Sequence, residues 1–219
     1  MVNKTKPRIL HNIPQEESWD IPEVPYRGKI ITCRVYKNLT PAMNAEQLAK
    51  YYEKQKKDGN PYPTDSILTW NIFSKASDLD ENSKTSELRN FFYKAVREFL
   101  KTSSIVNYNP FEEKDEAVHN YNTSDQYSLR ENIAGPDGFI TGIPDKKTLK
   151  SLLGKSNVNE INKTSQYLNE TDMSIWRLIR KPTQKEKRVV RFYADGGRLG
   201  LYADWYLSNG VSCSSGIED

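Results

Sequence analysis

The residues whose types are best suited to chemistry are one histidine and the acidic residues just before it. His119 follows a cluster formed by Glu112, Glu113, Asp115 and Glu116. A carboxylate beside an imidazole can orient it as a general base, so one hypothesis is a hydrolase or nuclease centred on His119. The competing interpretation is an ordinary strand residue after a solvated acidic loop, because no nucleophile or oxyanion donor accompanies it in the sequence.

The sequence has no pattern typical of a metal or cofactor site. The acidic cluster lacks the ligand spacing of a calcium loop, and Cys33, Cys213 and the two histidines lack the spacing of zinc ligands. Asp195-Gly196-Gly197 is not a phosphate-binding loop, because it joins two predicted strands and does not open a helix. We therefore expect no metal, no cofactor and two reduced thiols.

Residues suited to anion binding gather near the C-terminus. Basic residues outnumber acidic ones between positions 176 and 198, and the candidate binding residues are Arg177, Arg191, Tyr193, Arg198 and Tyr202. Guanidinium groups pair with phosphates, and aromatic rings on a sheet stack bases at ~1–3 kcal/mol each. This pattern predicts a surface that contacts nucleic acid or an acidic partner protein. The alternative is that Arg191 covers Tyr193 or Tyr202 as a cross-strand cation–π pair.

The overall charge restricts this hypothesis to a local patch. The 219 residues include 32 Lys and Arg against 29 Asp and Glu, a formal net charge of +3. That balance is not typical of an obligate binder of nucleic acid or membranes. No stretch approaches the ~20 apolar residues of a membrane-spanning helix, and the first residues lack the apolar core of a signal peptide. We expect a cytoplasmic protein with no membrane partner.

The element that must position the candidate binding residues is a predicted β-hairpin. Residues 189–194 (VVRFYA) are β-branched and aromatic, residues 195–197 (DGG) are a strong turn signal, and residues 198–207 alternate in polarity. A loop of residues 195–196 or of residues 196–197 leaves the same residues on each face. The residues predicted to point inward are Val190, Phe192, Leu199, Leu201 and Trp205. Those predicted to point outward are Arg191, Tyr193, Arg198, Tyr202 and Tyr206.

Helices precede most of the strands. The sequence predicts a strand over residues 29–36, a helix opening at Thr40-Pro41, a second helix capped by Thr64 or Asp65, and a third over residues 86–101. Paired strands over 117–121 and 126–130 follow, then helices from Asp145 to 153 and from 158 to 168. Because regular βαβ alternation is absent, we predict an α+β fold: an N-terminal extended arm and helices packed on a mainly antiparallel sheet with a C-terminal β-hairpin.

Prolines set the predicted domain organisation. Pro7, Pro14, Pro22 and Pro25 bias their neighbours away from helix, so residues 1–28 are predicted to form an extended arm. Residues 29–219 are predicted to form a single α+β domain with a potential sub-boundary near residues 103–114. The arm and the exposed tyrosines together support a further hypothesis, a protein-interaction module.

Several short segments carry a resemblance to other proteins. They are residues 119–121 (HNY), residues 132–137 (NIAGPD), and residues 175–178 (IWRL) with Lys181-Pro182 and Arg188-Val189. Over residues 60–207 the chain resembles uncharacterised small archaeal proteins. The resemblance implies a microbial cytoplasm and implies no activity or site residue. The basic-aromatic residues, and not this resemblance, favour a small binding module with a basic-aromatic sheet face over an enzyme.

Overall fold

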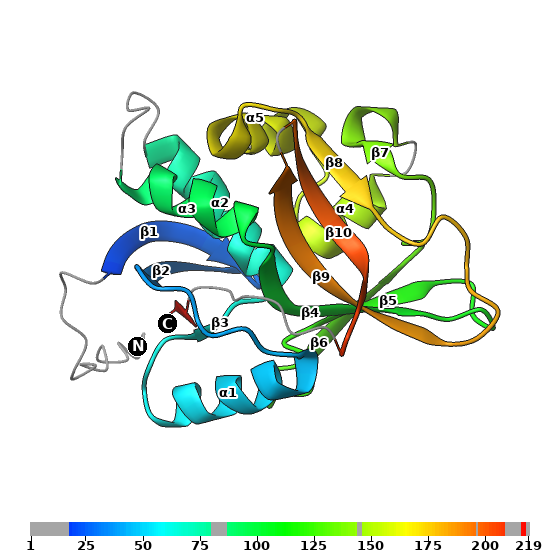
Figure 1. Cartoon of the computed structure of the whole chain (residues 1–219), viewed down its shortest axis with the longest axis horizontal. Helices are drawn as coiled ribbons and strands as arrows, with labels where there is room; N and C mark the ends of the chain where they lie inside the picture. The colour runs from blue at the N-terminus through cyan, green and yellow to red at the C-terminus, as the bar shows by residue number, and fades with distance from the viewer. Residues whose placement is uncertain (1–17, 80–86, 144–145, 196, 209–215, 218–219) are drawn as a thin grey trace, which may run out of the picture.

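A curled seven-stranded sheet forms the centre of the structure (Figure 1), which is a computed structural model describing residues 18–79, 87–143, 146–195, 197–208 and 216–217. Its strand order is β6-β5-β4-β9-β10-β8-β7, and two-stranded sheets β1-β2 and β11-β3 accompany it. The β10–β8 pair is parallel and the other neighbours in the large sheet are antiparallel. The predicted α+β fold with a mainly antiparallel sheet is confirmed.

The elements of the described residues have the following bounds. The helices are α1 (Ala45–Lys57), α2 (Ser66–Leu79), α3 (Glu87–Arg97), the short 3₁₀ helix η2 (Ile140–Gly142), α4 (Lys147–Leu153) and α5 (Val158–Asn169). The first strands are β1 (Ser18–Tyr26), β2 (Lys29–Tyr36), β3 (Tyr62–Pro63), β4 (Leu100–Tyr108), β5 (Asp115–His119) and β6 (Tyr127–Glu131). The others are β7 (Gly138–Phe139), β8 (Met173–Trp176), β9 (Glu186–Asp195), β10 (Arg198–Tyr206) and β11 (Gly216–Ile217).

Helix α2 fills the main core against one face of the sheet, called the inner face below. The helix starts after Asp65, whose carboxylate accepts a hydrogen bond from the backbone N–H of Leu68 at 2.8 Å, as expected of a helix N-cap. Its Trp70 ring stacks on Phe192 of β9 with centroids 5.6 Å apart, and Phe73 contacts both Phe92 of α3 and Phe192. Burial of these rings stabilises the fold on this face.

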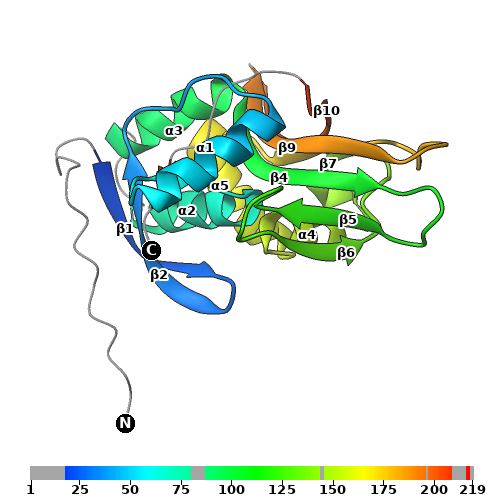
Figure 2. The same cartoon turned by 90° about the horizontal axis from the view of Figure 1, so that it is seen from below.

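Helix α1 covers part of the opposite face, called the outer face below. Ala45 packs there with Ile105 of β4, Val118 of β5 and Val189 of β9. The residues that follow these on the same strands, Val106, His119 and Val190, point to the inner face, because side chains alternate along a strand. All three are buried there. Figure 2 shows β9, β4, β5 and β6 side by side. The outer face therefore has only partial cover, and it carries four of the predicted binding residues, Arg191, Tyr193, Arg198 and Tyr202.

Several predicted elements form where the sequence places them. Strand β2 covers Lys29–Tyr36 and helix α5 covers Val158–Asn169. The hairpin β9–β10 pairs Asp195 with Arg198 and Phe192 with Leu201, which is the register predicted for a loop of residues 196–197. Gly196 itself lies outside the described residues.

Two predicted helix boundaries are wrong. Helix α1 begins at Ala45 and not at Thr40-Pro41, because Asn44 and Gln47 form a reciprocal capping box that satisfies two backbone N–H groups. Helix α3 ends at Arg97 and does not reach residue 101. Phe99 has φ of +59°, a left-handed conformation that breaks the helix, and β4 begins at Leu100.

Parts of the predicted arm and of the predicted sub-boundary lie within the described residues. Strand β1 lies within the predicted arm, yet it pairs with β2 across residue 28 and packs against α2. Residues 1–17 lie outside the described residues, as do Asp145 and Cys213, whereas Cys33 is buried in the core. Residues 103–108 of the predicted sub-boundary lie inside β4, which pairs with both β5 and β9.

The predicted burial of Trp205 is also wrong. Strand β10 has a bulge after Tyr202. Tyr202 pairs with Arg191 and Trp205 pairs with Val189, so β10 advances three residues where β9 advances two. An extra residue inverts the alternation of a strand beyond it. Trp205 consequently lies on the outer face with Tyr202, while Ala203 occupies the core.

Candidate functional site

The outer face of β8, β9 and β10 carries a group of partly exposed aromatic rings around an arginine. Strand register places Arg191 opposite Tyr202, and Tyr202 opposite Trp176 on the neighbouring strand β8. We call this surface the aromatic–arginine face, and its members are Phe99, Trp176, Arg191, Tyr193, Tyr202 and Trp205. Three of the predicted binding residues, Arg191, Tyr193 and Tyr202, therefore do come together.

The rings of this face form two parallel pairs. Phe99 and Tyr193 stack with centroids 3.8 Å apart and an interplanar angle of 3°, and Trp176 and Tyr202 stack at 5.8 Å and 9°. Tyr193 of one pair contacts Tyr202 of the other, with their ring centroids 6.0 Å apart. Each of these rings retains partial exposure, so the face presents flat π-surfaces at the boundary with solvent.

Arg191 lies beneath the rings and not at the surface. Its guanidinium carbon is 3.6 Å from the ring centroid of Trp205, 4.7 Å from Phe99 and 4.9 Å from Tyr202. The residue is only 4% exposed, and its Nε and Nη1 groups have no hydrogen-bond partner among the described residues. Burial lowers the pKa of Arg191, and the nearby Asp204 carboxylate opposes that shift. Its position over the Tyr202 ring matches the alternative given for Arg191 from the sequence, a cross-strand cation–π pair.

The charged side chains beside the rings include Arg191, Arg198 and Asp204. Arg198 is exposed at the edge, with its guanidinium 5.9 Å from the ring centroids of Phe139 and Trp176. Burial raises the pKa of Asp204, although Arg191 pulls it in the opposite direction. The Asp204 Oδ1 atom is buried and has no hydrogen-bond partner within the described chain. The face is therefore an aromatic platform with a buried cation, and not a broad basic surface.

Arg177, the remaining predicted binding residue, is not on this face. It is 5% exposed, and its guanidinium donates hydrogen bonds to the carbonyl oxygens of Ile133 at 2.9 Å and Pro136 at 3.2 Å. A Cβ atom at Gly135 would lie 2.7 Å from its Nη2, so glycine permits this close contact. These hydrogen bonds hold the segment between β6 and β7 in place, so the Arg177 guanidinium has a structural role.

His119 is enclosed in the core between β5 and α4. It is 0% exposed, its Nδ1 lies 2.9 Å from the Ser104 hydroxyl, and its Nε2 lies 3.0 Å from the carbonyl oxygen of Ser151. A carbonyl only accepts, so Nε2 carries the proton and Nδ1 accepts from Ser104. Burial is the largest cause of the lowered pKa of this imidazole. His119 is therefore a neutral structural residue with no access to a substrate.

The predicted partnership of His119 with the acidic cluster does not form. Asp115 is buried, and one of its carboxylate oxygens accepts the backbone N–H groups of Ile133 and Ala134, each at 3.0 Å. Glu116 is one residue further along β5 and belongs to the outer face, whereas His119 belongs to the inner face. Strand alternation therefore separates the imidazole from Glu116, and Glu112 and Glu113 lie exposed in the loop before β5.

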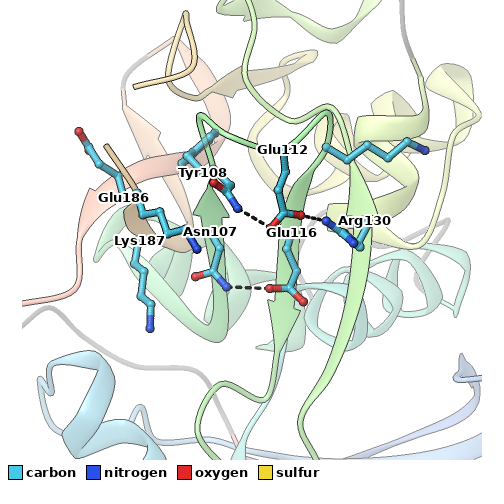
Figure 3. Close-up of a pocket in the computed structure, with 10 residues that line it drawn as sticks. Asn107, Tyr108, Glu112, Glu116, Arg130, Glu186 and Lys187 are labelled. Atoms are coloured by element: carbon cyan, nitrogen blue, oxygen red, sulfur yellow. Dashed lines mark hydrogen bonds and ion pairs between the residues drawn. The ribbon is translucent and has the colours of Figure 1, made fainter. Parts of the chain in front are cut away.

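A polar pocket of about 380 Å³ opens on the outer face at the far end of β4 (Figure 3). Its floor is a row of paired residues across four strands: Arg130 of β6, Glu116 of β5, Asn107 of β4 and Lys187 of β9. Glu112, Lys185 and Glu186 stand around it. Sequence reasoning missed this pocket because its residues come from four separate strands.

The sequence also missed three residues of the aromatic–arginine face. Phe99 was placed in a helix and Trp205 in the core, and Trp176 was not identified as a platform residue because strand order was unknown. The parallel pairing of β8 with β10 is what brings Trp176 beside Tyr202. No local signal in the sequence indicates that pairing.

Comparisons with protein families, with curated proteins and with solved structures found no match. Within the described residues, no three His, Cys, Asp or Glu side chains converge in a way that could hold a metal ion. No helix of the described chain is long and apolar enough to cross a membrane.

Proposed function

We propose that this protein is a binding module whose aromatic–arginine face stacks the bases of single-stranded nucleic acid. The observation that carries the proposal is the pair of parallel, partly exposed ring stacks on one sheet face, Phe99 with Tyr193 and Trp176 with Tyr202. A base has a flat π-surface that such rings accept, and each stacked base contributes ~1–3 kcal/mol.

The charge distribution favours stacking over phosphate contact. Arg198 is an exposed cation at the edge of the face, while Arg191 is enclosed by rings. With about one phosphate contact, the logarithm of the affinity should fall with the logarithm of salt concentration at a slope of about −0.7. A steep slope would indicate a basic surface elsewhere on the protein. This shallow dependence distinguishes the proposal from general polyanion binding.

The test is fluorescence anisotropy with a short labelled single-stranded RNA, repeated with the corresponding duplex. Tyr202→Leu removes one stacking ring and should weaken single-strand binding by about 5- to 150-fold, the equivalent of ~1–3 kcal/mol. Arg198→Glu should weaken it further at low salt. Phe111→Leu is the matched control, because Phe111 is an exposed ring outside the face.

Unchanged single-strand binding by the double variant Trp176→Leu with Tyr202→Leu would refute the proposal. Circular dichroism of each variant establishes that the fold is retained. If wild-type protein binds neither strand form, the same rings are better explained as a contact for a protein partner. His119 supports no second candidate function, since it is enclosed in the core.

A further inference from the structure

The polar pocket on the outer face carries an inference that is independent of the aromatic–arginine face. Its central feature is Asn107, whose Nδ2 donates to the Glu116 carboxylate at 2.9 Å. That bond directs the other atom of the amide, Oδ1, away from Glu116 (Figure 3). Asn107 Oδ1 is buried and has no hydrogen-bond partner in the described part of the chain. A buried acceptor without a donor is costly, so a ligand donor there would be favoured.

Several charged residues around the pocket already have an ion-pair partner. Glu112 forms an ion pair with Arg130, and Glu186 forms one with Arg188. Glu116 differs, because its hydrogen-bond partner is the neutral amide of Asn107 and no described cation forms an ion pair with it. Within the described chain, the pocket therefore offers one carboxylate without an ion-pair partner beside one unsatisfied carbonyl oxygen. Both are acceptors, and an ammonium group supplies the donors and the charge that they lack.

The other wall of the pocket is positive. Lys185 is exposed there, and Lys187 lies on the opposite side of Asn107 from Glu116 with its ammonium 5.3 Å from the ring centroid of Tyr121. Glu116 and Lys187 are two strands apart, about 10 Å between backbones. These lysines would repel a ligand with only positive charge, and they would attract a carboxylate attached to the ammonium group.

We propose that this pocket binds the zwitterionic head of a free α-amino acid. The ammonium group donates to the Glu116 carboxylate and to Asn107 Oδ1, and the carboxylate group lies toward Lys185 and Lys187. The near neutrality of the pocket matches a ligand with no net charge. Of the two lysines, Lys185 is the more available, because Lys187 already contacts an aromatic ring.

The test uses three probes that share a hydrocarbon chain and differ in their charged groups. Norleucine has both groups, pentylamine lacks the carboxylate and hexanoate lacks the ammonium group. Each is titrated into the full-length ¹⁵N-labelled protein, and the side-chain amide signals of Asn107 are followed by NMR. With about nine non-hydrogen atoms, norleucine should bind with a dissociation constant in the millimolar range. Pentylamine should bind more weakly, and hexanoate should leave the Asn107 signals in place.

Two variants assign the contacts. Glu116→Gln keeps the shape of the side chain and should weaken norleucine binding by about tenfold or more, because a hydrogen bond to a charged group is lost. Lys185→Ala should reduce the preference for norleucine over pentylamine. Glu46→Gln is the control, since Glu46 is an exposed carboxylate on α1 outside the pocket.

The inference is overturned by any of three results. These are no shift of the Asn107 signals at about 20 mM norleucine, which is well above the expected dissociation constant, equal binding of hexanoate and norleucine, or undiminished binding by Glu116→Gln. If Glu116→Gln does not fold, the comparison of the three probes on wild-type protein and on Lys185→Ala decides the question. RNA binding is measured separately, so failure here leaves the proposal for the aromatic–arginine face untouched.

Discussion

The enclosed imidazole of His119 predicts that the protein loses stability in mild acid. In the native state the ring is neutral, with its Nε2–H donating to the Ser151 carbonyl and its Nδ1 accepting from Ser104. Burial lowers its native pKa from the ordinary value of 6.5. The unfolded chain regains a pKa of about 6.5, so it binds a proton that the native state refuses.

The size of the effect follows from this difference. Above pH 6.5 both states are mostly neutral, and the contribution of His119 to the free energy of unfolding is constant. Below pH 6.5 the unfolded state gains a proton, and stability falls by up to about 1.4 kcal/mol per pH unit until the native pKa is reached. Between pH 6.5 and 5.0 the loss is therefore up to about 1.7 kcal/mol, a substantial share of the ~5–15 kcal/mol typical of a domain.

Urea unfolding at pH 7.5, 6.5, 5.5 and 5.0 measures this dependence. His119→Gln should be less stable than wild type at pH 7.5, and it should show a shallower loss towards pH 5.0. His11→Gln is the matched control, because it removes the other histidine of the chain. The raised pKa of Asp204 acts in the opposite direction in acid, and the difference between wild type and His119→Gln cancels it. Identical pH slopes for wild type and His119→Gln would show that the imidazole is not held neutral.

Two further comparisons of variants test the packing. Gly154→Ala should lower the free energy of unfolding by about 1–2 kcal/mol, because Gly154 has φ of +73° and an added Cβ would lie 2.8 Å from Ile67 Cγ2. Gly142→Ala, where nothing lies within 4 Å, serves as its control, and equal melting temperatures for the two would contradict the reasoning. Trp205→Ala should cost about 1–2 kcal/mol and Trp70→Ala about 3–5 kcal/mol in chemical denaturation, because only Trp70 is in the core. Equal losses of unfolding free energy for the two variants would contradict the placement of Trp205 on the outer face.

Local patterns in the sequence determined much of the secondary structure. The β-branched run of β2, the capped apolar stripe of α5 and the glycine turn of the β9–β10 hairpin each depend on neighbouring residues, so they can be predicted without knowledge of the fold. The apolar alternation of the hairpin also placed Phe192 and Leu201 in the core, where both are buried. These features follow from periods of 2 and 3.6 residues, which the sequence displays directly.

The tertiary structure decided which polar residues are available for function. Arg177 and Arg191 appear in the sequence as surface charges, yet one fastens a segment through backbone carbonyls and the other is enclosed by rings. A single bulge in β10 moved Trp205 from the predicted core to the outer face.

Both candidate sites combine residues from strands that are distant in sequence. Asn107 and Glu116 meet Lys187 only because β9 pairs with β4, and Trp176 meets Tyr202 only because β8 pairs in parallel with β10. Each choice of partner strand depends on the burial of the whole sheet under its helices, and no stretch of neighbouring residues encodes it.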